Sequence, residues 1–369
     1  MAVGILYREE LKEYDFGPGH PFRGDRYELF PPFLKSRLKE DDYYRFHATD
    51  PANEHDLLEI CDKDYIDFVR EYYHAASAGW LSYYENFSRY LSLDNRPIGI
   101  PGKIEEAARL VIGQAKAACD LIQRGDYKKV ISIGGGMHHA RRRYGEGFCI
   151  YNDVAFAAQY LINEYHLERI LILDTDAHAG NGTAEYIRSN EKILFIDIHQ
   201  DPKTIYPGTG FTQEVGSGPA RGHTVNIPLP LYAGDDSYRL VFDSIVLPLT
   251  EEFKPQIIIR NGGSDPHFND GLTYLGLTIA GFRMIGDKVR EMAVVCQGRE
   301  IDLIASGYNK TVLPYAWLSL LAGIANFPII VEEPEPIPEI YQKDRAFADT
   351  EAVVNEVIKY HREFWKCLR

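Results

Sequence analysis

Asp176 and His178 have side-chain types that could chelate a metal ion, and they directly follow an apolar run. Side chains two residues apart in an extended segment point the same way, so both could reach one ion. Asp265, after Asn261-Gly262-Gly263-Ser264, would add a second carboxylate. This ligand set leaves positions open for water and substrate, as a catalytic zinc ion requires. The alternative is that both aspartates cap helices, and Asp-x-His alone is a nonspecific pattern.

A second candidate group is the pair His138-His139, which follows Gly134-Gly135-Gly136. The glycines allow the chain to turn tightly and approach a ligand. Two adjacent imidazoles near neutral pH could share general acid and base duties. Tyr308, in another glycine-containing turn, could donate its hydroxyl to a developing oxyanion. A structural role is common for a single buried histidine and less expected for a pair at a glycine-rich strand end.

Alternating strands and helices would position these residues. The apolar pattern predicts helices over 102–124, 154–165, 184–189, 236–253 and 279–295, and strands over 129–133, 169–174, 193–198, near 225 and over 257–259. Strands that are apolar on both faces and separated by helices indicate a mostly parallel sheet covered by helices on both faces. Ligands of such sheets bind beyond the carboxyl ends of the strands. The polar groups stand at those ends, at 134–139, 174–178, 197–199, 261–265 and 306–308.

The rest of the sequence bears on domain organisation, partners and location. Residues 1–100 have few periodic runs, so we expect loops and short helices there, contributing to a pocket rim. Without a repeat or linker, residues 1–369 are predicted to form a single domain.

With 40 basic and 54 acidic residues the net charge is −14, which disfavours nucleic-acid binding. The five cysteines are scattered, which disfavours a disulfide framework, and no apolar run suits a secretory signal or a bilayer span. We therefore expect a cytoplasmic protein that binds no membrane.

Several motifs in order give the chain a family resemblance. They are Gly19-His20-Pro21, Gly136-Met137-His138-His139-Ala140, Gly147-Phe148-Cys149-Ile150-Tyr151-Asn152-Asp153, the run from Asp174 to Gly182, Tyr206-Pro207-Gly208-Thr209-Gly210, Asn261-Gly262-Gly263-Ser264-Asp265 and Gly307-Tyr308-Asn309. Over nearly its whole length the chain resembles the zinc-dependent histone deacetylase family, which includes acetoin-utilisation proteins and acetylpolyamine amidohydrolases. The resemblance implies the three-layer α/β fold of arginases and deacetylases.

The resemblance also implies roles for individual residues. Asp176, His178 and Asp265 match the zinc ligands, with Fe²⁺ as an alternative ion. His138 and His139 match the histidines that handle protons, and Tyr308 matches the residue that polarises the acyl carbonyl. Asp174 and Asn181 fall at the partner positions of His138 and His139, respectively. A neutral asparagine stabilises an imidazolium less than an aspartate does, so His139 should be the more easily deprotonated ring. Asn181 and Ala179 bring the motif closest to the class IV-like branch.

Other matching positions concern the substrate and a second ion. Gly147, Phe148, Tyr206 and Leu272 match the positions that line a narrow tunnel for an acylated chain. Asp174 and Asp197 lie where relatives hold a structural K⁺ or Na⁺ ion. Asp94 is the nearest counterpart of an acidic residue at the rim in some relatives, His267 is expected at the mouth, and His199 is expected in the core.

The predicted function is a zinc-dependent amide hydrolase that removes an acetyl or other short acyl group from an acylated primary amine. The expected substrate is a lysine side chain of a protein or peptide, with an acetylated polyamine or other small amine as the alternative. A noncatalytic acyl-lysine binder or scaffold would be a different class, but no catalytic position has lost its functional side chain. A two-manganese ureohydrolase would need an aspartate where Gly180 stands. The acyl length and the oligomeric state stay open.

Overall fold

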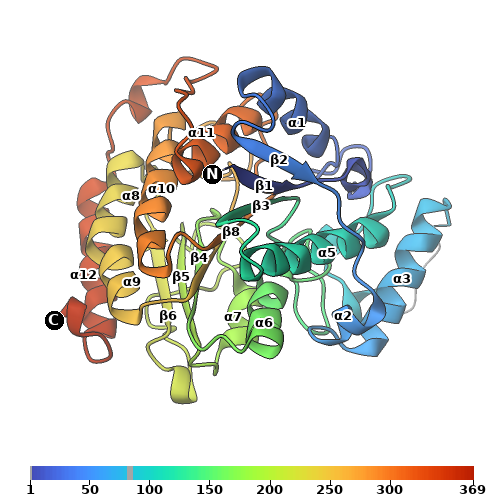
Figure 1. The fold of residues 1–369 in the computed structure, drawn as a ribbon, viewed down its shortest axis with the longest axis horizontal. Helices are drawn as coiled ribbons and strands as arrows, with labels where there is room; N and C mark the ends of the chain where they lie inside the picture. Colours follow the sequence, from blue (N-terminus) through green and yellow to red (C-terminus); the bar gives the residue numbers. More distant parts are fainter. Residues whose placement is uncertain (1, 81–85) are drawn as a thin grey trace. The chain divides into compact units, whose positions relative to one another are not determined.

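A sheet of eight strands forms the centre of the fold in the computed structural model, which describes residues 2–80 and 86–369. The strands follow the hydrogen-bonded order β2-β1-β3-β8-β7-β4-β5-β6. Parallel pairing joins β1 to β2 and β3, β4 to β5 and β7, and β5 to β6. The strands are β1 Val3–Leu6, β2 Tyr44–His47, β3 Lys129–Ile133, β4 Ile170–Asp174, β5 Ile193–Gln200, β6 Thr224–Leu229, β7 Ile257–Asn261 and β8 Glu300–Ile304 (Figure 1). Helices flank this sheet, so the α/β fold expected from the sequence is confirmed.

Twelve α-helices connect or follow the strands of the described chain. They are α1 Arg26–Arg37, α2 Glu54–Leu58, α3 Lys63–Ser77, α4 Phe87–Tyr90, α5 Ile104–Gln123, α6 Asp153–Tyr165, α7 Asn181–Ile187, α8 Asp235–Val241, α9 Leu247–Phe253, α10 Ile279–Met292, α11 Leu313–Ala325 and α12 Phe347–His361. A π-helical segment, Phe242–Val246, joins α8 to α9, so the helix predicted over 236–253 continues from one into the other. Within the described residues, no helix has both the length and the apolar character needed to cross a bilayer.

The chain separates into two compact units. The N-terminal unit consists of Met1–Tyr165 with Asp302–Ala305, and the C-terminal unit consists of His166–Ile301 with Ser306–Arg369. In the N-terminal unit α5 packs against β3 and α6. In the C-terminal unit α10 packs against α11, and α12 packs against β6 and α8. Every residue of β4, β5 and β7 is buried, which explains their continuous apolar runs.

The register of the C-terminal unit aligns three polar residues across neighbouring strands. Asp174, the last residue of β4, pairs with Asp197 of β5 on one side and with Asn261 of β7 on the other. Because these strands are parallel, their carboxyl ends lie at one edge of the sheet. The segments that carry Asp176, His178 and Asp265 leave the sheet at this edge.

Two parts of the fold differ from the sequence expectation. The first hundred residues contain two strands of the sheet, β1 and β2, and the 15-residue helix α3. Strand β5 extends beyond its predicted end at 198 to Gln200, so His199 lies within the strand rather than beyond it. The five cysteines are all free, as expected, and only Cys367 is exposed.

Candidate active site

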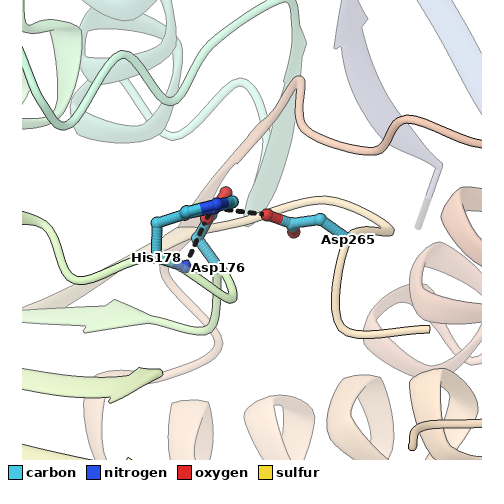
Figure 2. Close-up of side chains that lie close together, drawn as sticks. All are labelled: Asp176, His178 and Asp265. Atoms are coloured by element: carbon cyan, nitrogen blue, oxygen red, sulfur yellow. Dashed lines mark hydrogen bonds and ion pairs between the residues drawn. The ribbon is translucent and has the colours of Figure 1, made fainter. Parts of the chain in front are cut away.

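Three buried side chains of the C-terminal unit converge at the carboxyl ends of β4 and β7. The Nδ1 atom of His178 lies 3.0 Å from Asp176 Oδ1 and 3.1 Å from Asp265 Oδ2. Figure 2 shows that the three side chains point toward one another. One ligand atom from each lies within 4.8 Å of the others. The structure therefore brings together the three residues predicted as metal ligands.

Local hydrogen bonds shape the turn that follows β4. Asp174 Oδ1 accepts the backbone N–H of Asp176 at 3.0 Å, and Asp176 Oδ1 accepts the backbone N–H of His178 at 2.9 Å. The Thr175 N–H donates to the carbonyl of Asn261 on β7 at 2.9 Å. Asp176 thus does not cap a helix, because α7 starts five residues later at Asn181. The helix-cap alternative is excluded for this aspartate.

The electrostatics of the cluster suit a cation. Burial alone would lower the pKa of His178, but hydrogen bonds to Asp176 and Asp265 and their charges raise this pKa to about 10. Burial, together with the charge of Asp176, raises the pKa of Asp265 to about 8. Ligands at 2.0–2.1 Å from a tetrahedral ion stand roughly 3.3 Å apart, close to the distances in this cluster. Donor types, spacing and charge therefore all fit a divalent ion.

The paired histidines belong to the N-terminal unit, where their two Nε2 atoms lie 3.0 Å apart. Asn152 Nδ2 donates to the backbone carbonyls of His138 and Ala140 at 3.2 and 3.0 Å. Gly147 packs so closely that a Cβ atom added there would lie 2.2 Å from His139 Cδ2. Both rings are buried and held in fixed positions, as a proton-transfer pair requires.

Asp153 supports this pair, although its residue type and position predicted no role for it. Its Oδ1 and Oδ2 accept the backbone N–H of Gly136 at 3.0 and 2.8 Å, and Oδ1 accepts that of Met137 at 2.7 Å. Burial raises the pKa of Asp153 to about 6, although these bonds and the charge of His138 oppose the rise. The carboxylate therefore holds the turn that ends in His138. The signals in the sequence were its place in the motif from Gly147 to Asp153 and at the start of a predicted helix.

The predicted tunnel residue Phe148 adopts a left-handed backbone conformation, with φ +65°. This conformation is costly for a bulky residue and needs support from its surroundings. Asn95 Oδ1 accepts the N–H of Phe148 at 2.7 Å, and the Tyr14 hydroxyl donates to its carbonyl at 2.8 Å. Asp94 Oδ2 accepts the N–H of the preceding Gly147 at 3.0 Å. Asp94 thus supports the Gly147–Phe148 turn within the N-terminal unit.

Asp174 and Asp197, the predicted ligands of a monovalent ion, already accept hydrogen bonds. Asp174 Oδ2 accepts from Asn261 Nδ2 at 2.8 Å. Asp197 Oδ2 accepts from the Gly180 N–H, and Asp197 Oδ1 lies 2.9 Å from His199 Nδ1. His199 Nε2 donates to the carbonyl of Gly210 at 2.9 Å, so this histidine is a core residue, as expected. Direct binding of an ion by Asp197 would compete with its two bonds, and the monovalent site stays a prediction.

The other predicted site residues lie in loops or at a helix start of the C-terminal unit. Asn181 begins α7, while Tyr206 and Leu272 are partly exposed and Tyr308 is half-buried. His267 differs from its expected place at the mouth, because only 1% of its side chain is exposed and its Nε2 contacts Glu333. A hydrogen bond between His267 Nε2 and Glu333 Oε2, 3.1 Å long, satisfies the buried imidazole.

Comparisons with known proteins give the family. The family model described as "Histone deacetylase domain" matches residues 20–324. A protein of Archaeoglobus fulgidus named "Probable deacetylase" is 32% identical, with all of both chains covered. The "Acetoin utilization protein AcuC" of Staphylococcus xylosus is 35% identical over 86% of this chain and 81% of its own length. The crystal structure of the HDA15 HD domain, 24% identical, has the same fold, with a TM-score of 0.82 over 100% of this chain and 97% of that chain. The chain therefore belongs to the histone deacetylase family and is an enzyme of the deacetylase class.

Proposed function

We propose that this chain is a zinc-dependent deacylase that hydrolyses the amide of an acetylated or short-acylated lysine side chain. The observation that carries the proposal is the buried group of Asp176, His178 and Asp265. A divalent ion held there would lower the pKa of a bound water and polarise an acyl carbonyl. Zinc suits one imidazole and two carboxylates in a site that keeps a position open.

The chain's own residues would do the rest of the chemistry. His138 and His139 take the proton from the attacking water and deliver one to the leaving amine. Asp174 and Asn181 act as their respective partners, so the ring of His139 is the easier one to deprotonate. The Tyr308 hydroxyl donates to the carbonyl oxygen as negative charge develops on it.

Aromatic side chains would pack against the aliphatic part of the acylated lysine side chain. Phe148 and Tyr206 supply flat walls, Leu272 an apolar contact, and Gly147 a close approach to the backbone. Such a tunnel favours a linear acylated amine over a bulky or branched amide. The protein would work in the cytoplasm, where lysine-acylated proteins are available and thiols stay reduced.

The test is an assay of the zinc-loaded protein on acyl-lysine peptides of increasing acyl length and on acetylated polyamines. We expect Tyr308→Phe to keep its metal and lower turnover of an acetyl-lysine peptide by about two to three orders of magnitude, the usual loss for one oxyanion donor. Tyr360→Phe on α12 is the matched control and should keep full activity, since α12 packs against β6 and α8.

Three other results of this assay would each indicate a different function for the chain. Turnover of polyamines alone would replace the lysine substrate with a small amine. Tight binding of the acyl-lysine peptide without turnover would identify a noncatalytic reader. Two tightly bound ions with urea release from guanidino compounds would identify a ureohydrolase.

A further inference from the structure

Asp270 lies on the loop between the metal-site aspartate and the predicted tunnel residue, and nothing above gives it a role. We infer that Asp270 is a positioning residue that sets the orientation of Tyr308 for the reaction. The inference rests on the proposed function, because it concerns the hydroxyl assigned there to the acyl carbonyl. All the residues in the argument belong to the C-terminal unit.

The Asp270 carboxylate holds two backbone groups at once. Its Oδ2 accepts the N–H of Tyr308 at 2.7 Å, and its Oδ1 accepts the N–H of Leu272 at 2.9 Å. Hydrogen bonds to an ionised acceptor are shorter and stronger than those between neutral groups. One side chain therefore ties the predicted carbonyl-polarising residue to the predicted tunnel wall.

The turn that carries Tyr308 is anchored at its other end to the metal-site aspartate. The Ser306 hydroxyl donates to Asp265 Oδ1 at 2.7 Å, and the Ser306 carbonyl accepts the N–H of Ser264 at 3.0 Å. Between the anchors lies Gly307, with φ +127°, a conformation that glycine adopts freely. The turn is therefore fixed by its neighbours rather than by its own backbone preference. Asp270 is an anchor on the Tyr308 side, where Asn309 Nδ2 also donates to the carbonyl of Asn269 at 2.7 Å.

Hydrogen bonds also hold the loop that carries Asp270. The Asp270 N–H donates to the carbonyl of His267 at 2.9 Å. His267 Nδ1 accepts the N–H of Asn269 at 3.1 Å, so its Nε2–H donates to Glu333. Glu333 also accepts the N–H of Ile279 at the start of α10. A loop held to a helix in this way gives Asp270 a fixed position from which to hold Tyr308.

The physical consequence falls on turnover. A hydrogen-bond donor stabilises the transition state only when it is aimed at the oxygen that gains charge. Misplacement by about 1 Å can cost about a hundredfold in rate. Removing the Asp270 carboxylate should therefore lower kcat through Tyr308, whereas its bond to Leu272 affects KM for the acyl-lysine peptide.

The experiment is a double-mutant cycle with Asp270→Ala and Tyr308→Phe on the zinc-loaded protein. We expect Asp270→Ala to lower kcat about 10- to 100-fold in the parent and less than about threefold in the Tyr308→Phe background. Asp270→Asn keeps one carbonyl oxygen for the two N–H groups and should fall between the parent and Asp270→Ala. Glu252→Ala is the matched control, because Glu252 accepts the backbone N–H groups of Lys366 and Cys367 at the end of the chain.

The outcomes separate this inference from the proposed function. Equal loss of kcat from Asp270→Ala in both backgrounds, or an unchanged kcat, overturns the positioning role. If Asp270→Ala loses zinc or does not fold, Asp270→Asn is tested in its place. Its loss of kcat must then also be smaller in the Tyr308→Phe background than in the parent. Absence of deacylase activity in the zinc-loaded parent overturns the proposed function instead.

Discussion

The His178 ring lies between two buried carboxylates, an arrangement that is unfavourable without a compensating cation. Charges are costly to bury, and burial together with the charge of Asp176 raises the pKa of Asp265. The two carboxylates raise the pKa of His178 against the effect of its burial, so they favour a positive charge at this point. Perturbed titratable groups that converge in a site are typical of function rather than of packing. Charge as well as geometry therefore favours a metal ion at these residues.

Single substitutions in this group should change the metal content of the protein. Asp265→Asn and His178→Ala should each lower the affinity for Zn²⁺ by at least about tenfold, because each removes a ligand or its charge. Elemental analysis after dialysis against a weak chelator measures the loss. His199→Gln is the control, since His199 stands in an identical Asp-x-His spacing but contacts Asp197 and Gly210 instead. Full zinc content in both ligand variants would contradict the site.

Residue types made the candidate metal ligands predictable, but not the residues that support the site. Metal binding calls for carboxylate and imidazole side chains at a strand end, and few other roles need this combination. The motifs that contain Asp176, His178 and Asp265 therefore stood out in the sequence. Asp153 and Asp270 act by accepting backbone N–H groups, which any of the 54 acidic residues could do. Their partners come from turns whose shape exists only in the folded chain, so the sequence pattern could not single them out.

At the scale of elements, the pattern predicted the buried strands β3 to β7 and gave no bounds for β1, β2 and β8. β3, β4 and β7 are five-residue apolar segments next to periodic helices, and their positions match the prediction closely. β1 has only four residues, and β2, Tyr-Arg-Phe-His, mixes aromatic and charged side chains. Pairing of β2 with β1 decides its structure, because local preference in four residues is weak.

The turn at Gly147 gives a test at this scale. Gly147→Ala would place a Cβ 2.2 Å from His139 Cδ2 and should displace the ring, lowering turnover by about a hundredfold. Gly125→Ala is the matched control, because Gly125 also has a positive φ, +80°, but faces open space. It should cost only about 1–2 kcal/mol of stability and leave turnover unchanged. Equal turnover in the two variants would show that His139 tolerates the shift.

For the whole molecule, folding couples the C-terminal helix α12 to the sheet through buried contacts. α12 packs against β6, and beyond its end Trp365 Nε1 donates to the carbonyl of Gly222 at 2.8 Å. His361, the last residue of α12, is fully buried, and its ring lies 6.4 Å from that of Phe364. Burial lowers the pKa of His361 to about 4. The ring is therefore neutral in the folded chain at every pH at which the enzyme would work.

This buried histidine predicts acid sensitivity of the entire fold. In the unfolded chain an imidazole has a pKa of about 6.5, so between about pH 6.5 and 4 the unfolded state binds more protons. The contribution of His361 is therefore fully present above pH 6.5 and is lost as pH falls, by up to about 3 kcal/mol. Urea unfolding at pH 7.5 and pH 5 should show a smaller loss of stability for His361→Leu than for the parent. His166→Leu, at an exposed position, should keep the parent's loss, and an unchanged loss in His361→Leu would mean that other groups cause the acid sensitivity.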